Sequence, residues 1–145
     1  MTRATRSHTI RGHLVAGGLV DLELTEARQK AGPDGHDVDG FSTRQHRDED
    51  NTLVVVAGAY GPNWLRTLAE ISGRLESPHV KCTVRGQVPG LGDHEVLVRW
   101  ATSAELQERK RIAEKRQAPL KQQLRRQQAE EQRQELEAAG QSGLF

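Results

Sequence analysis

The sequence predicts a small, mainly β domain with one packed helix, followed by a long charged helical tail. Three observations lead to this fold class. Before residue 102, short runs alternate apolar with polar side chains, as half-buried strands do. Within residues 64–75, apolar side chains recur three or four positions apart, the spacing of an amphipathic helix. After Ser103 large aliphatic residues become sparse, so a core has to form from the residues before about 102.

The first half of the chain predicts two strands and a loop. Residues 1–8 read as a flexible basic N-terminus. Strands are expected at 9–15 and 19–24, with the Gly17-Gly18 pair as a turn or bulge between them. Turn formers are dense in the following segment and apolar side chains are few, so residues 26–50 are expected to form a long, mobile, acidic loop.

The second half predicts three more strands and the helix. The β-branched run 51–57 is typical of a central strand buried on both faces. Glycines at 58–61 then indicate a turn, and Pro62 suits the first turn of a helix that Ser77-Pro78 ends. Residues 80–88 and 95–100 alternate again around a Pro-Gly turn, which predicts a hairpin.

Five strands with a helix before the fourth fit an OB-like small barrel that is partly open. A split α+β sheet covered by one helix is the competing arrangement. The order of elements favours the barrel only slightly.

The tail is expected to be helical from 103 to 139. Strong helix formers dominate it, and Gly140 is a plausible stop, which leaves 140–145 as a flexible end. Pro119 predicts a kink there, or two helices in place of one rod. Apolar residues are too sparse in the tail for a heptad seam, so a stable dimeric coiled coil is not predicted.

The formal net charge of +1 conceals a strong separation of charge along the chain. Residues 21–50 hold nine acidic side chains against four basic ones, a net of −5. Residues 109–126 hold eight basic side chains against Glu114 alone, a net of +7. Such a run binds nucleic-acid phosphates or is simply a solvated or partner-facing helix. The bases are Arg109, Lys110, Arg111, Lys115, Arg116, Lys121, Arg125 and Arg126.

Several functional classes lose support. The single cysteine, Cys82, excludes an intramolecular disulfide and reads as a small buried hydrophobe. No signal peptide or membrane-length apolar run is evident, so a soluble, cytoplasmic protein is expected. No nucleophile motif appears, so no catalytic residue and no enzyme activity is expected. Neither the acidic, histidine-containing loop nor the 58–61 turn has metal-site or phosphate-loop spacing, so no metal and no cofactor is predicted.

The stretch from about 19 to 100 resembles a distant HIRAN domain, a small β-rich module found beside DNA-repair enzymes. The resemblance lies in residues 46–56, where His46-Arg47-Asp48-Glu49-Asp50-Asn51 leads into a valine-rich strand, and in Tyr60-Gly61-Pro62 and 80–86. Thr52 stands where the family commonly has alanine, the turn is rearranged, and 26–45 would be an insertion. The resemblance implies an OB-like barrel that binds DNA ends.

The sequence therefore predicts a non-enzymatic nucleic-acid-binding accessory protein, with DNA as the first candidate partner. Tyr60, Arg66, Arg85 and Arg99 would lie on the barrel face and orient a strand, while the basic tail supplies electrostatic affinity. The alternative is a protein-interaction adaptor or assembly protein whose tail, residues 103–139, docks on a partner. DNA against RNA, the partner's identity, the oligomeric state and cation binding by the 26–50 loop stay open.

Overall fold

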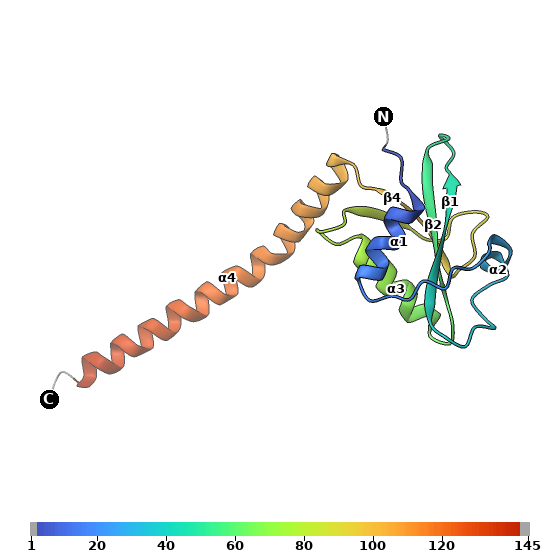
Figure 1. Ribbon diagram of the computed structural model, residues 1–145. Helices are drawn as coiled ribbons and strands as arrows, with labels where there is room; N and C mark the ends of the chain where they lie inside the picture. Colours follow the sequence, from blue (N-terminus) through green and yellow to red (C-terminus); the bar gives the residue numbers. More distant parts are fainter. Residues whose placement is uncertain (1–2, 143–145) are drawn as a thin grey trace. The chain divides into compact units, whose positions relative to one another are not determined.

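The computed structural model describes residues 3–142, and it divides into two compact units, residues 1–102 and 103–145. The division falls at Ser103, where the sequence predicts the start of the tail. The first unit holds three helices and four strands (Figure 1). They are α1 (Ser7–Ala16), α2 (Glu26–Lys30), β1 (Gly40–Arg47), β2 (Leu53–Tyr60), α3 (Trp64–Leu75), β3 (Cys82–Arg85) and β4 (Glu95–Trp100).

The four strands form one antiparallel sheet in the order β1-β2-β4-β3. β1 and β2 are a hairpin, with Gly40 opposite Tyr60 and Arg47 opposite Leu53. After β2 the chain passes through α3 to the far edge, and β4 then returns between β3 and β2. The sheet is not closed, so the fold is α+β and the predicted barrel is not present.

Helices α1 and α3 pack on one face of this sheet (Figure 1). Alternation along the strands places Val55, Ala57 and Ala59 of β2 on that face, with Val96 and Val98 of β4 beside them. The side chains that complete this core are Ile10, Leu14, Phe41, Ile71, Leu75, Val80 and Cys82. The central strand, the helix that follows it and the last hairpin are therefore present as predicted, although Leu65 of α3 is exposed. The turn predicted at 58–61 is wrong for residues 58–60, which continue β2 and pair with β1.

The predicted first two strands are wrong. Residues 7–16 form a helix, in which Ile10 and Leu14 are buried one turn apart while Val15 is exposed. Residues 19–24 make only an isolated bridge, through bonds from Phe41 N to Val20 O (2.8 Å) and from Leu22 N to Phe41 O (2.9 Å). This segment therefore exchanges two backbone hydrogen bonds with Phe41 of β1, one donated and one accepted by Phe41, and forms no full strand.

The predicted mobile loop 26–50 is also wrong. It contains α2, which begins with Thr25 accepting a bond from Arg28 N, and the whole of β1. β1 was hidden because its side chains are mostly polar, apart from the buried Phe41. On the face away from α1 and α3, Ser42 and Arg44 of β1 make hydrogen bonds to Gln29 and Glu95. Because polar side chains are buried there, the sequence of β1 shows no alternation of aliphatic residues.

The N-terminal segment is held in place from residue 3 onward, contrary to the predicted flexible 1–8. Thr5 is fully buried, its amide donates to Leu53 O (2.9 Å), and its hydroxyl accepts from Trp100 N (3.2 Å). The guanidinium of Arg3 lies 4.8 Å from the Trp100 ring centre, within cation–π range. Residues 1–2 lie outside the described part of the chain.

The second unit is one helix, α4 (Ser103–Ser142), about 60 Å long at about 1.5 Å per residue. Pro119 lies inside it, so a division into two helices is not observed. The helix also continues past Gly140, which was predicted to end it. The rest of the predicted flexible end, residues 143–145, lies outside the described residues. None of the helices described has the length and apolarity of a transmembrane span.

Candidate nucleic-acid interface

The face of the sheet opposite α1 and α3 is divided into a covered half and a hollow half. Over the covered half, α2 contributes Gln29, whose backbone oxygen accepts bonds from Tyr60 Oη (3.3 Å) and His94 Nε2 (2.8 Å). Because a carbonyl can only accept, His94 carries its proton on Nε2 in this arrangement. The two bonds hold α2 down on the strand ends.

A buried ion pair completes the covered half. Arg44 of β1 reaches across β2 to Glu95 of β4, and the side chains are 11% and 2% exposed. Arg44 also donates to Gln29 Oε1 (3.1 Å), and Glu95 accepts from Gly92 N (3.2 Å). Among the described residues no buried side-chain nitrogen or oxygen lacks a partner, so this cluster is occupied by its own internal bonds.

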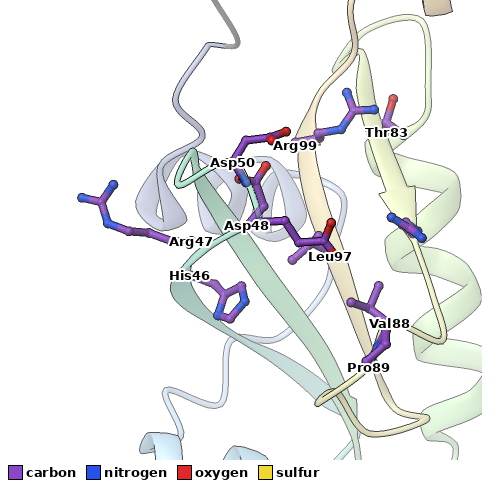
Figure 2. Close-up of a pocket in the computed structure, with 11 residues that line it drawn as sticks. His46, Arg47, Asp48, Asp50, Thr83, Val88, Pro89, Leu97 and Arg99 are labelled. Atoms are coloured by element: carbon purple, nitrogen blue, oxygen red, sulfur yellow. The ribbon is translucent and has the colours of Figure 1, made fainter.

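The hollow half is a surface depression of about 480 Å³ (Figure 2). Its floor comes from the last hairpin, where Thr83 lies opposite Arg99 and Arg85 opposite Leu97. All four point away from the helices, because their neighbours Val84 and Val98 contribute to the core. The remaining lining residues are His46, Arg47, Asp48, Glu49, Asp50, Val88 and Pro89.

The acidic β1–β2 connection forms one wall. Asp48 Oδ1 accepts from Asp50 N (3.0 Å) and Thr52 N (2.8 Å), so this carboxylate folds its own loop. Arg47 donates to Asn51 O (3.0 Å), and Figure 2 shows its side chain directed away from the other lining residues. Val88 and Pro89, from the β3–β4 connection, lie across the hollow.

The hollow is balanced in charge. Three arginines and three carboxylates line it, so it is no basic groove. The opposite charges come from different elements: the carboxylates from the β1–β2 loop, and Arg85 and Arg99 from the floor. Arg99 Nη1 donates to Trp100 O (3.2 Å).

The structure brings together only two of the four residues predicted on a binding face. Arg85 and Arg99 share the floor of the hollow. Tyr60, predicted to be exposed, is fully buried at the end of β2, and burial raises the pKa of its phenol well above the usual range. Arg66 lies on α3, where it pairs with Glu70 (3.4 Å) beside a separate depression of about 210 Å³.

The start of α3 is not an open anion site. Asp39 Oδ1 accepts from Asn63 N (2.8 Å), and Oδ2 accepts from Asn63 Nδ2 (3.0 Å). These bonds hold the pKa of Asp39 below its usual value. A carboxylate of the chain itself therefore lies where a phosphate would bind, and the turn at Gly61 packs against Asp39.

Within residues 3–142 no group of three or more histidine, cysteine, aspartate and glutamate side chains could hold a metal ion. The acidic residues of 34–50 are distributed between the α2–β1 connection and the β1–β2 loop, which β1 separates.

The basic residues of α4 are exposed, except that Arg109 is half-buried. Arg111 pairs with Glu108 (2.9 Å) one turn before it. Inside 109–126 the only acidic side chain is Glu114, so bonds within this segment cannot neutralise most of its charge.

Sequence reasoning missed several residues of the hollow. Thr83 and Leu97 could have been found, because alternation along the predicted hairpin places them on the face of Arg85 and Arg99. His46 could not, because the sequence predicts a loop over 26–50 where the structure has β1.

Comparisons of the chain with protein-family models, curated proteins and solved structures found no match. The resemblance to HIRAN domains therefore stays a prediction.

Proposed function

We propose that this chain is a non-enzymatic accessory protein that binds nucleic acid, with α4 supplying electrostatic affinity and the hollow sheet face contacting the strand. The observation that carries the proposal is the basic segment of α4, with eight bases, seven of them exposed, against one acid. Neutralising phosphates with such residues releases counterions, which favours binding without regard to sequence. The same charge opposes pairing of two copies side by side through this segment.

The first unit supports a binding role more than a catalytic one. Arg44 donates hydrogen bonds to the buried Glu95 and Gln29, and these bonds stabilise the sheet. The hollow is open and holds Arg85 and Arg99 on adjacent strands, where they can approach a phosphate backbone.

The test is fluorescence anisotropy with labelled single- and double-stranded DNA and RNA over a salt series. A charge-neutral variant would carry glutamine at the bases 110, 111, 115, 116, 121, 125 and 126, since glutamine keeps helix propensity. Each phosphate contact contributes a slope of about −0.7 to −0.9 to the dependence of log affinity on log salt. The variant should therefore bind more weakly and with a shallower slope.

A matched control replaces Glu130, Glu131, Glu135 and Glu137 with glutamine, which makes the net charge of the same helix more positive. It should bind at least as tightly as the parent chain. No binding at low salt, or equal binding by the charge-neutral variant, overturns the proposal.

A second candidate function is that of a protein-interaction adaptor whose α4 docks on a partner. Its support is the exposure of Leu120 (66%) and Leu124 (56%), which lie one turn apart on one side of α4. The affinity for a protein partner bound by this apolar side would be insensitive to salt and would weaken when both leucines are changed to glutamine. The affinity for nucleic acid would not depend on the two leucines.

A further inference from the structure

The hollow on the sheet face separates its charges in a way that suits one kind of ligand. Its three carboxylates are on the β1–β2 loop, and two of its three arginines, Arg85 and Arg99, are on the β3–β4 hairpin. The third, Arg47, points away from the other lining residues (Figure 2). A uniformly anionic ligand would be attracted by one side and repelled by the other. The arrangement favours a ligand with a negative group at one end and hydrogen-bond donors at the other.

We propose that the hollow holds one nucleotide of a single strand and selects bases that carry an exocyclic amine over thymine or uracil. This inference rests on the proposed function and specifies the ligand of the same surface. The phosphate lies over the arginines and the base edge faces the β1–β2 loop.

The arginine side of the hollow suits a phosphate. Arg85 and Arg99 are diagonal neighbours on paired strands, and such residues are about 7–8 Å apart. Both point to the hollow face of the sheet, and Arg85 is exposed. Guanidinium groups bind phosphate oxygens through charge-assisted and frequently bidentate bonds, so two adjacent ones can hold the backbone on either side of a nucleotide.

The carboxylate side discriminates between bases. An ionised carboxylate only accepts hydrogen bonds, so it pairs with an amino group such as N4 of cytosine or N6 of adenine. Thymine presents its O4 acceptor at the corresponding position, which a carboxylate repels. Glu49 and Asp50 are both exposed, and Asp48 anchors the loop that carries them.

Size and composition favour a single unpaired nucleotide. A volume of about 480 Å³ lies within the usual range of small-ligand sites, roughly 300–1,000 Å³. In a duplex one hydrogen of each amine is already bonded to the opposite strand, so only an unpaired base presents its whole Watson–Crick edge to the loop. Leu97, Val88 and Pro89 offer apolar contact, but none of the lining residues is Phe, Tyr or Trp. Recognition therefore depends on the base edge more than on stacking.

The experiment compares the full chain's affinity for oligo(dC) and oligo(dA) with its affinity for oligo(dT) of equal length, at neutral pH. Oligo(rC) against oligo(rU) provides the RNA arm. Since the strands carry equal charge, the contribution of α4 is the same for each. We expect about tenfold tighter binding of the amine-bearing strands.

The decisive variant is Glu49→Gln/Asp50→Asn, checked for folding by its thermal melt. Removing two negative charges should raise the affinity for every strand while the preference falls toward unity. The control Glu130→Gln/Glu131→Gln makes the same charge change on α4 and should leave the preference intact. Equal affinity of the parent chain for all homopolymers, with a steep salt slope, overturns this inference and leaves the proposed function standing. Failure of every strand to bind overturns both.

Discussion

Changing Arg44 to methionine should remove a large part of the stability of the first unit. Methionine keeps much of the side-chain length but cannot donate to Glu95. The Glu95 carboxylate, 2% exposed, would then keep only its bond from Gly92 N. Removing one partner of a buried ion pair costs about 3–5 kcal/mol, because the remaining charge is left uncompensated in a poorly solvated site.

That loss is large beside the total free energy of unfolding of a small domain, about 5–15 kcal/mol. For a unit of this size each kcal/mol lowers the Tm by about 4–8 °C. Urea titration followed by tryptophan fluorescence measures the change, because Trp64 and Trp100 both pack against the core. The matched control is Arg47→Met on the same strand, whose guanidinium is bonded to the exposed Asn51 carbonyl. It should change stability by less than about 0.5 kcal/mol.

A double variant, Arg44→Met/Glu95→Leu, separates the charge from the packing. Replacing both members with apolar side chains removes the buried charge, so the double variant should be more stable than Arg44→Met alone. A loss below about 1 kcal/mol for Arg44→Met would refute the reasoning, since it would mean that Glu95 is well solvated or finds another donor. A double variant as unstable as the sum of the single changes would refute it too.

Three further predictions concern single side chains. Tyr60 is the chain's one tyrosine, so alkaline titration of phenolate absorbance reports it alone. Because burial raises the pKa of Tyr60 in the folded state, the stability gained by keeping this phenol neutral is complete below about pH 10 and is lost above it. Phenolate absorbance should therefore appear only together with unfolding. Asp39 has a lowered pKa in the folded state, so its contribution to stability is present above about pH 4 and is lost as pH falls through the folded pKa. The Tm difference between the parent chain and Asp39→Asn should therefore narrow in acid, and a constant difference would contradict this. Gly58→Ala would place a Cβ 2.7 Å from Tyr60 Oη, so thermal melts should show a loss of about 1–3 kcal/mol, and an unchanged Tm would show that the ring can move aside.

The elements predicted correctly are those in which the spacing of apolar residues along the sequence matches the positions that are buried in the fold. β2 is a central strand with seven buried positions, and its β-branched run has no other explanation at that length. In α3 the buried Ile71 and Leu75 follow the helical period, and Pro62 precedes them. The β3–β4 hairpin alternates on both of its strands.

α1 was misread because a short segment fits both periods. Ile10 and Val15 are β-branched and so are compatible with a strand, and only the interval of four between Ile10 and Leu14 favours a helix. Tertiary packing decides the matter, since α1 covers the sheet face beside α3. A single sequence does not reveal that this face needs a second helix.

β1 was missed for a different reason, which also hid part of the hollow. Arg44 and Ser42 point to a face whose partners are polar, namely Glu95 and Gln29, and those partners come from distant parts of the chain. Polar burial of this kind has no local periodicity, because each bond depends on two elements meeting in space. Tyr60 was placed in an exposed turn for the same reason: nothing before it predicted that α2 would cover it.

The two faces of the sheet thus differ in the side chains that they bury, and this difference explains why the hollow is balanced in charge. The face under α1 and α3 is apolar and holds the unit together. The other face needs polar partners, and wherever α2 stops covering it, the same types of side chain, arginines beside carboxylates, become accessible. Under the proposed function, a surface of this kind can distinguish one base from another but adds little net attraction. The attraction then has to come from a separate run of like charge, which is the composition of α4 between residues 109 and 126.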